Sequence, residues 1–338
     1  MKQTDARRIT SPPLDLAYVE SVVRKHYGFP AHALHLSGDR GENFRIYGRD
    51  ATGHVFKVLS PGESIATADL LPAVLMHLER VAPELPVPRI VRTLEGHTLV
   101  KFNDLRGTPR IASLCTFLPG KLLLSTTRCS AQRRACGELL ARLAKALHTF
   151  DHQGCRREVA WDIAQIPQLA RVMTKVPELP SAHFLRDFVT RFTVEIAPRL
   201  DKLRHQFVHN DFSVRNIIVD PHEESRVVGI IDFGDAVHTG LICDVAIGAT
   251  GQLAMPETAN EAVHDFVEAY CQVEPLQKEE LALLKWLIAG RIVLNVVLTA
   301  WRRIENRCSG HIDGFDSAFF GWRIDFAKRL VYSPVWQS

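Results

Sequence analysis

Side chains that could bind a metal ion and move a proton are concentrated in residues 207–235, which read FVHNDFSVRNIIVDPHEESRVVGIIDFGD. Asp211 and Asn216 lie five positions apart, on a loop expected between two short β-type runs. A further expected strand, VVGII, is followed directly by Asp232. Oxygen atoms from one loop and one strand end can converge on a single point. Such a point suits a hard divalent cation and leaves one carboxylate to act as a base.

The order of these residues resembles a kinase catalytic loop followed by a metal-binding Asp-Phe-Gly motif. The variant here is HNDFSVRN followed by IDFGD, which is similar to the aminoglycoside phosphotransferase and choline kinase superfamily rather than to the protein kinases. The resemblance implies phosphoryl transfer from ATP or GTP. Asp211 would orient the acceptor hydroxyl and take its proton, while Asn216 and Asp232 would hold Mg²⁺.

Structural explanations compete with these roles. Asp211 could be a turn aspartate and Asp232 a strand-end cap, but their joint spacing favours chemistry. We expect His209 to brace the loop by hydrogen bonds, and Asp244, in LICDVAIGA, to anchor the loop from a buried position. For Asp235 two roles are equally expected: support of the metal site and contact with the substrate.

The phosphate-binding parts are expected near the N-terminus. The segment SGDRGENF, residues 37–44, contains Gly38, Gly41 and Asn43, and glycine lets backbone amides approach phosphates closely. By itself the segment also fits an ordinary turn before a strand. Lys57 supports a phosphate-binding role for this region, because a lone lysine among the alternating apolar residues of HVFKVL needs a partner. The resemblance implies that Lys57 contacts the α and β phosphates.

The acidic partner that the resemblance implies for Lys57 is missing from the expected place. The following helix, IATADLLPAVLMHLERV, has no glutamate in its middle, and Asp69 or Glu63 are the candidate substitutes. Pro72 is expected to lie within the first turn of this helix, where proline is tolerated.

The periodicity of the chain changes along its length. Residues 34–102 alternate as short strands do, whereas segments after residue 128 place Leu139, Leu143 and Leu147 on one helical face. We expect an α+β, bilobal, protein-kinase-like fold. Residues 1–114 would form a small antiparallel-sheet lobe that binds the nucleotide, residues 115–120 (CTFLPG) a hinge, and residues 121–338 a mainly helical catalytic lobe. Backbone groups near Thr116 and Leu118 would meet the purine.

Composition sets limits on partners and compartment. The 338 residues carry 41 basic and 38 acidic side chains, a balance that does not favour nucleic-acid binding. Seven cysteines without a CxxC pair fit a reduced, cytoplasmic protein, and no signal peptide is expected in the first residues. The apolar run at residues 281–301 is interrupted by Lys285, Arg291 and Asn295, so we expect a buried core helix rather than a membrane span.

The acceptor is suggested by a narrower resemblance, to the hydroxylysine kinase branch of the superfamily. It is carried by LPVPRIV, by FDHQGCRREVAWDIAQ at residues 150–165, by the HND form of the loop and by IDFGDAVHTGLICDVAI. The resemblance implies phosphorylation of a hydroxyl on a small amino-acid-like or aminated molecule, with 5-hydroxylysine as one candidate.

A cationic acceptor would be held by carboxylates and by an aromatic wall at Trp161. The acids that could border the cleft are Asp235, Glu158, Asp162, Asp313 and Asp316, although each, like Trp161, also fits a solvated or structural role. Two other hypotheses stay open: an aminoglycoside or other small-molecule kinase, and a pseudokinase that binds a nucleotide or a partner protein without catalysis. The oligomeric state is not readable from the sequence.

Overall fold

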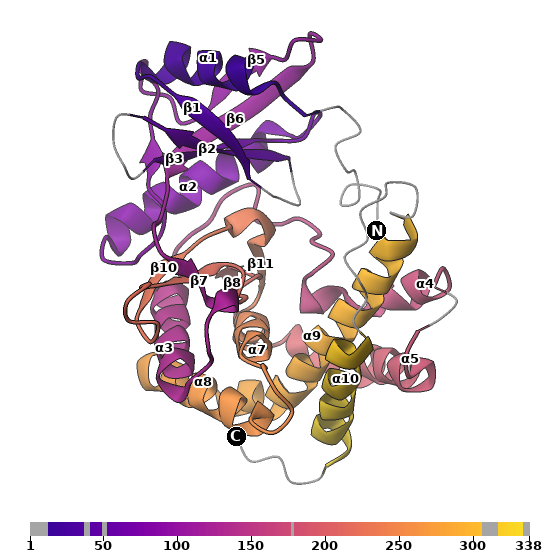
Figure 1. Cartoon of the computed structure of the whole chain (residues 1–338). Helices are drawn as coiled ribbons and strands as arrows, with labels where there is room; N and C mark the ends of the chain where they lie inside the picture. The colour runs from indigo at the N-terminus through magenta and orange to yellow at the C-terminus, as the bar shows by residue number, and fades with distance from the viewer. Residues whose placement is uncertain (1–12, 37–40, 49–52, 177–178, 306–316, 334–338) are drawn as a thin grey trace.

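The protein consists of two lobes, one above the other in Figure 1. The computed structural model describes residues 13–36, 41–48, 53–176, 179–305 and 317–333. The N-terminal lobe is built on an antiparallel sheet with two helices, and the C-terminal lobe is mostly helical. The α+β, bilobal organisation expected from the change in periodicity is therefore confirmed.

The main sheet belongs to the N-terminal lobe. Its strands run in the order β1-β2-β3-β6-β4, and β5 also pairs with β6. Their bounds are β1 His32–Leu36, β2 Glu42–Tyr47, β3 His54–Val58, β4 Ile90–Val91, β5 Val100–Asn103 and β6 Pro109–Thr116. In β3 the alternate residues Phe56 and Val58 are buried in the lobe's core. Lys57 therefore points to the opposite face of the sheet.

Helix α2 (Ile65–Val81) corrects one expectation. Pro72 lies in the interior of α2 and not in its first turn, so the helix lacks the hydrogen bond that an N–H at this position would donate to Ala68. The helix continues because Leu70, Val74 and Leu75 on either side of the proline are buried. Tertiary packing outweighs the local cost of the proline here.

The core is divided unevenly between the lobes. Helix α1 (Leu16–Tyr27) packs on the sheet around Phe44 and Phe56, within a small core. The larger core fills the C-terminal lobe and also takes in the buried face of α2. Helix α2 thus contacts β4 and β6 of the N-terminal sheet and also packs into the core of the C-terminal lobe.

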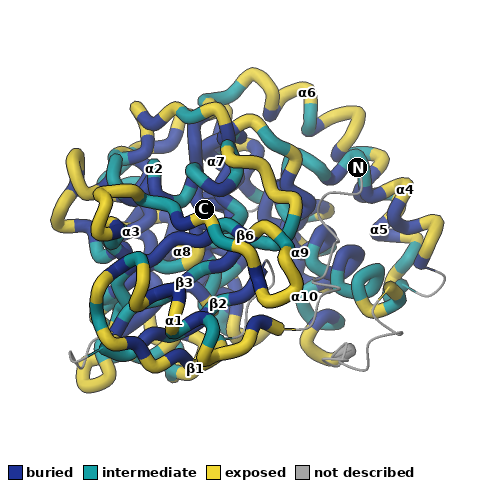
Figure 2. The backbone as a smooth tube through the Cα atoms, turned by 90° about the horizontal axis from the view of Figure 1, so that it is seen from above, coloured by how far each residue is buried: buried dark blue, intermediate teal, exposed yellow. Residues whose placement is uncertain are grey.

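The C-terminal lobe surrounds the buried helix α7, whose residues 241–250 are all buried (Figure 2). Its elements are η1 Leu123–Ser125, α3 Ser130–Leu147, η2 Ile163–Gln168, α4 Leu169–Met173, α5 Ala182–Arg191, the π-helical turn η3 Phe192–Ile196, α6 Ala197–Leu200, α7 Leu241–Gly251, α8 Ala259–Val273, α9 Lys278–Glu305 and α10 Ser317–Tyr332. By length and composition α9 resembles a membrane span, yet 78% of its most apolar window is buried inside the protein. As expected, residues 281–301 lie in a core helix.

Two small sheets lie where the lobes meet. One has the order β10-β9-β7 and the other pairs β11 with β8. Their strands are β7 Lys121–Leu122, β8 His205–Val208, β9 Ile217–Val219, β10 Val227–Ile230 and β11 Val237–Gly240, with the short turn η4 at Phe233–Asp235. Residues 209–216 connect β8 to β9, so the small sheets hold both ends of this loop.

Candidate active site

The loop between β8 and β9 is fixed from below by α7. The carboxylate of Asp244 accepts hydrogen bonds from the backbone N–H groups of His209, at 3.1 Å, and Asn210, at 2.8 Å. Burial raises the pKa of Asp244 to about 6, against the effect of these two amides. Asn210 adopts a left-handed conformation, with φ of 62°. The anchor therefore holds a turn that an ordinary residue rarely adopts.

The His209 ring connects the loop to the strand that precedes Asp232. Its Nδ1 accepts from the Asp211 N–H at 3.2 Å, and its Nε2 lies 3.1 Å from the Ile231 carbonyl oxygen. The two contacts are satisfied together by the neutral tautomer that carries its proton on Nε2. Burial lowers the pKa of His209 to about 4, which keeps the ring neutral. The geometry gives His209 a bracing position.

Asp211 and Asn216 are in direct contact. The Asn216 side-chain nitrogen donates to Asp211 Oδ2 at 2.6 Å and to the Asp211 carbonyl oxygen at 3.0 Å. The other carboxylate oxygen, Oδ1, accepts from Arg291 Nη2 at 3.3 Å. Burial raises the pKa of Asp211 to about 7; Arg291 opposes the shift, and Asp235 and Asp232 add to it. A carboxyl group with a pKa near neutrality is suited to general-base catalysis.

Asp232 faces the lysine of the other lobe. Lys57 Nζ lies 3.4 Å from Asp232 Oδ1. Lys57 is the main cause of the lowered pKa of Asp232. Burial acts against the charge of Lys57, but the Asp232 carboxylate outweighs it and the pKa of Lys57 is raised. The Ile231 N–H donates to the Asn216 carbonyl oxygen at 2.9 Å, which places the start of the Asp-Phe-Gly turn beside Asn216.

Lys57 has no acidic partner on α2 among the residues that the structure describes. Asp69 lies instead near His152, with 3.4 Å between Asp69 Oδ2 and His152 Nε2, and Glu63 is exposed. The substitutes considered from the sequence are therefore wrong. The lysine pairs directly with Asp232, because the α2 face toward it is formed by Thr67, Leu70 and Leu71.

A cavity borders this ion pair. Its lining includes Asn43, Lys57, Asp232 and Gly234, and it also includes Arg157, which the sequence analysis did not single out. Arg157 Nη2 donates to the carbonyl oxygens of Gly234, at 2.6 Å, and Ala236, at 2.9 Å. Asn43 is paired with Lys57 in the sheet register, so both side chains lie on one face. The cavity is thus lined by two cationic side chains, Lys57 and Arg157, next to the carboxylate of Asp232.

Gly41 and Thr116, which were expected to contact the nucleotide, also have structural roles. Gly41 has φ of 74°, and a Cβ there would collide with the Val58 carbonyl oxygen, so packing against β3 already accounts for this glycine. The Thr116 N–H donates to the Arg89 carbonyl oxygen and the Phe117 N–H to that of Gly53, so these two amides are already paired. The purine contacts expected at Thr116 and Leu118 stay a prediction. Gly38 lies outside the described residues.

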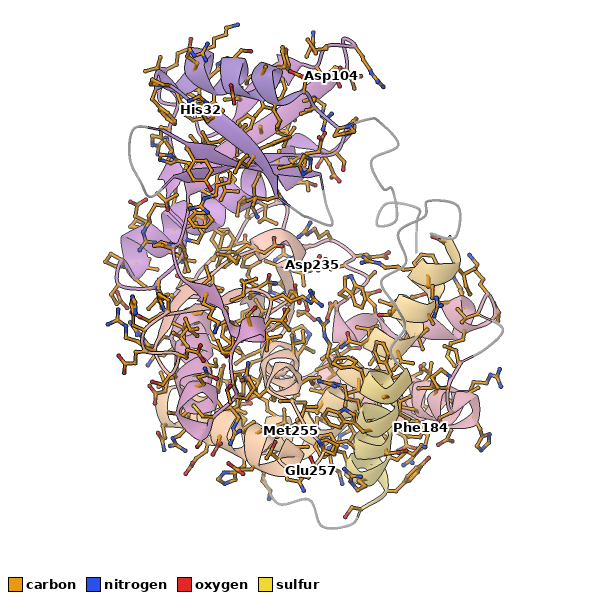
Figure 3. The ribbon with its side chains drawn as sticks, viewed as in Figure 1. His32, Asp104, Phe184, Asp235, Met255 and Glu257 are labelled. Carbon is orange, nitrogen blue, oxygen red and sulfur yellow. The ribbon has the colours of Figure 1, made fainter. Side chains whose placement is uncertain are left out.

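The residues expected to hold the acceptor do not form one cluster. Asp162 is buried, caps η2 through the Ala164 N–H at 3.0 Å and accepts from Thr239 Oγ1 at 3.2 Å, which does not favour substrate contact. The Trp161 ring lies 4.7 Å from the Arg302 guanidinium, a cation already in the protein. Asp235 lies on the side of the C-terminal lobe that faces the N-terminal lobe (Figure 3). Glu158 is exposed, and Asp313 and Asp316 lie outside the described residues.

Arg291 is a site residue that sequence reasoning missed. It is 6% exposed on α9, and its Nη1 donates to the Trp161 carbonyl oxygen at 2.6 Å. The available signal was its place within the apolar run at residues 281–301. A buried arginine in such a helix needs a carboxylate or carbonyl partner.

The residues present fit a magnesium ion. Asp232 and the Asn216 amide oxygen are hard oxygen donors, and the Asn216 nitrogen is turned toward Asp211. Within the described ranges no group of three or more His, Cys, Asp or Glu residues forms a complete cage. This is expected of Mg²⁺ in a nucleotide site, where phosphates and waters supply the remaining ligands.

Comparison with known proteins agrees with the geometry. The model of the phosphotransferase enzyme family matches residues 36–284. The chain belongs to this family. The hydroxylysine kinase of Danio rerio is 26% identical over 309 residues, covering 88% of this chain and 86% of the relative. The homoserine kinase of Methylobacillus flagellatus is 28% identical over 222 residues, covering 64% of each chain.

A solved structure shows the same fold. An amicoumacin kinase in complex with AMP-PNP and Ca²⁺ superposes with a TM-score of 0.68 at 15% identity, covering 94% of this chain and 93% of that chain. The kinase-like fold expected from the catalytic-loop spacing is confirmed. The protein is a small-molecule phosphotransferase that acts on a hydroxyl group, as the family and its relatives indicate. A nucleotide donor and a divalent metal are consistent with these relatives.

Proposed function

We propose that the protein transfers the γ-phosphoryl group of ATP or GTP to the hydroxyl of a small amino-acid-like or aminated molecule, with 5-hydroxylysine as the first candidate. The observation that carries the proposal is the contact of Asp211 with Asn216 beside the Asp232–Lys57 pair. This contact and this ion pair supply the groups that phosphoryl transfer requires, namely a base, two oxygen ligands and a cation for the phosphates. The choice of acceptor is supported by the similarity to hydroxylysine kinases.

Each residue has a task in this reaction. Asp211 orients the acceptor hydroxyl and accepts its proton as the new O–P bond forms, and the donor leaves as a nucleoside diphosphate. Lys57 binds the donor phosphates, and Arg291 and His209 hold the base and its loop in position. Mg²⁺, held by Asn216 and Asp232, would neutralise charge on the phosphates.

The proposed compartment is the cytoplasm. The cysteines in the described part of the chain, Cys115, Cys129, Cys136, Cys155, Cys243 and Cys271, are all free thiols. Free thiols are typical of a reducing compartment. This supports a cytoplasmic enzyme that draws on the cellular nucleotide pool.

An acceptor screen tests the proposal. The purified protein is incubated with Mg²⁺ and ATP or GTP, together with 5-hydroxylysine, homoserine, aminoalcohols and aminoglycosides. Nucleoside diphosphate and the phosphorylated product are measured. We expect 5-hydroxylysine to be preferred over aminoglycosides by at least a hundredfold in kcat/KM. If an aminoglycoside is preferred, the proposed acceptor is wrong and the protein is an aminoglycoside kinase. If the protein binds the nucleotide but transfers phosphate to no acceptor, it is a pseudokinase.

A further inference from the structure

A second cavity lies beside the catalytic loop, on the side of the C-terminal lobe formed by α7, α9 and α10. It has a volume of about 450 Å³. Its walls include residues 213–215 of the catalytic loop and Phe319 of α10. Four arginines also line it: Arg128, Arg215, Arg291 and Arg323. We call this space the arginine cavity.

Two of these arginines donate hydrogen bonds to residues at the C-terminal end of α7. Arg128 donates from Nη2 to the Gln252 side-chain oxygen, and Arg323 donates from Nη2 to the Leu253 carbonyl oxygen. Gln252 and Leu253 are neighbours in the chain, so both guanidinium groups donate to the same end of α7. They come from distant segments, one just before α3 and the other from α10.

The charge of this pair is not neutralised by the described residues. The described hydrogen bonds of Arg128 and Arg323 go to an amide oxygen and to backbone carbonyl oxygens, and no carboxylate of the described residues pairs with either guanidinium. The Nε and Nη1 atoms of Arg128 are buried and have no hydrogen-bond partner there. Burial lowers the pKa of Arg128, and burial alone lowers that of Arg323 to about 10. Both arginines are half-buried, and the Arg323 guanidinium lies 3.6 Å from the centre of the Phe319 ring. A half-buried cation without a carboxylate beside it is suited to an anionic partner.

Capping of α7 accounts for only part of this arrangement. Basic side chains do bind the free carbonyl groups at a helix C-terminus. In each arginine, however, a single nitrogen makes the contact with residues 252–253. Arg323 uses a second nitrogen for the Phe319 carbonyl oxygen at 3.3 Å, whereas two nitrogens of Arg128 remain unpaired. The remaining donors suit an oxyanion, which a guanidinium binds through two parallel hydrogen bonds.

The arginine cavity is connected to the catalytic base. Arg291 lines the cavity and also donates to Asp211 Oδ1 at 3.3 Å. Ser213 and Arg215, which lie between Asp211 and Asn216 in the chain, form part of the same wall. The cavity and the base thus share Arg291 and one loop.

We propose that the arginine cavity binds the carboxylate of the acceptor through Arg128 and Arg323 and so places the acceptor's hydroxyl at Asp211. This inference rests on the proposed function and narrows the acceptor to a hydroxylated amino acid. A polycation such as an aminoglycoside is repelled by the four arginines. Hydroxylysine and homoserine, after which two of the relatives are named, both carry a carboxylate. The sequence predicts an acceptor with a cationic group, and this inference adds that the acceptor also carries a carboxylate.

The test compares 5-hydroxylysine with its decarboxylated counterpart, 1,5-diaminopentan-2-ol. The ratio of their kcat/KM values is measured for the wild type, Arg128→Gln, Arg323→Met and Arg323→Lys. A surface control is Arg226→Ala, whose guanidinium is 62% exposed beside Asp220. We expect a wild-type preference for the amino acid of about a hundredfold, as two charge-assisted contacts would give.

The expected loss is selective. Arg128→Gln and Arg323→Met each reduce this ratio at least tenfold, Arg323→Lys restores part of it, and Arg226→Ala leaves it as in the wild type. Lysine, which has the carboxylate but not the hydroxyl of the acceptor, should inhibit competitively, and 1,5-diaminopentane should not. Because the readout is a ratio of two substrates, a general loss of folded enzyme does not imitate it.

Four results would overturn the inference. If the wild type phosphorylates both molecules equally, or if the ratio is the same in the arginine variants, the carboxylate is bound elsewhere while the proposed function stands. Competition by inorganic phosphate but not by lysine would show a phosphate-binding site. If no acceptor is phosphorylated at all, the proposed function fails and the inference fails with it.

Discussion

At the scale of single residues, Lys57 has two alternative partners. In the structure it lies 3.4 Å from Asp232, which is 53% exposed. A nucleotide with its metal would draw Asp232 to the cation and Lys57 to the phosphates, because both offer a stronger opposite charge. The ion pair explains how Lys57 is held without an acid on α2. That the phosphates bind at this pair stays a prediction.

Lys57→Met should weaken nucleotide use. The side chain keeps a similar length but loses its charge, so we expect kcat/KM for the nucleotide to fall at least tenfold, measured by steady-state kinetics at saturating acceptor. Lys101→Met, on the exposed face of β5, serves as the control and should leave kinetics unchanged. An equal, small effect of both substitutions would remove Lys57 from the phosphate site.

The sequence predicts which of these residues lie together in some cases but not in others. Asp211 and Asn216 could be placed together because both lie on one short loop, and Asp232 because the loop is followed by the β9–β10 hairpin. The partner of Lys57 could not be found, since the pair joins residues 57 and 232 across the two lobes. Arg291 was missed for the same reason: only the packing of α9 brings it to Asp211.

At the scale of elements, the short helix η2 begins with a buried acid. Asp162 caps it through the Ala164 N–H, and burial raises the pKa of Asp162 to about 6, against the effect of that amide. The folded protein therefore binds this proton more tightly than the unfolded chain does. The stabilising contribution of Asp162 is present at low pH and is lost as the pH rises through about 6.

Asp162→Asn should make stability less dependent on pH. Asparagine keeps the cap but cannot ionise. We expect the wild type to lose about 1 kcal/mol more free energy of unfolding than the variant between pH 5 and pH 7.5, in urea titrations at both values. Identical pH dependence in the two proteins would mean that Asp162 ionises normally.

Hydrophobic periodicity predicts most of the helices and strands. It does not predict where a helix changes its hydrogen-bonding pattern or continues through a proline. The segment LRDFVTRFTVEIAPRL has one apolar face, yet it forms α5, a π-helical turn and α6. Similarly, α2 continues through Pro72. In both cases burial against the larger core selects a local geometry that the sequence pattern alone does not favour.

At the scale of the whole molecule, the lobes are joined by residues 117–120 and by the shared packing of α2. Gly120 lies at the end of this connection, with φ of 144°. A Cβ there would lie 2.7 Å from the Val219 carbonyl oxygen. The connection passes so close to β9 that only glycine fits, and β9 directly follows Asn216.

Gly120→Ala should therefore disturb both stability and the site. We expect its free energy of unfolding to be lower by about 2 kcal/mol or more than that of Gly62→Ala, measured by denaturant titration. Gly62 also has a positive φ, but a Cβ there meets nothing within 4 Å. The comparison isolates the steric contact, and equal stabilities would argue against a tight connection.

The lobe boundaries at residues 114 and 120 stay a prediction, although the change from sheet to helix is plain in the structure. The periodicity of the sequence separates the two lobes, but it does not reveal that α2 packs into the core of the C-terminal lobe. That arrangement depends on contacts between distant segments. It also makes the two lobes less independent than their order in the chain implies.

The central claim, that Asp211 is the base for phosphoryl transfer, is tested most directly by the turnover of Asp211→Asn. Its kcat is compared with those of the wild type and of Asp201→Asn, a substitution at an exposed position after α6. The affinity for the magnesium nucleotide is measured by calorimetry on the same samples. We predict that kcat falls about 10²–10⁴-fold in Asp211→Asn while nucleotide affinity changes less than threefold. A kcat within tenfold of the wild type, in a variant that still binds the nucleotide, would contradict the account.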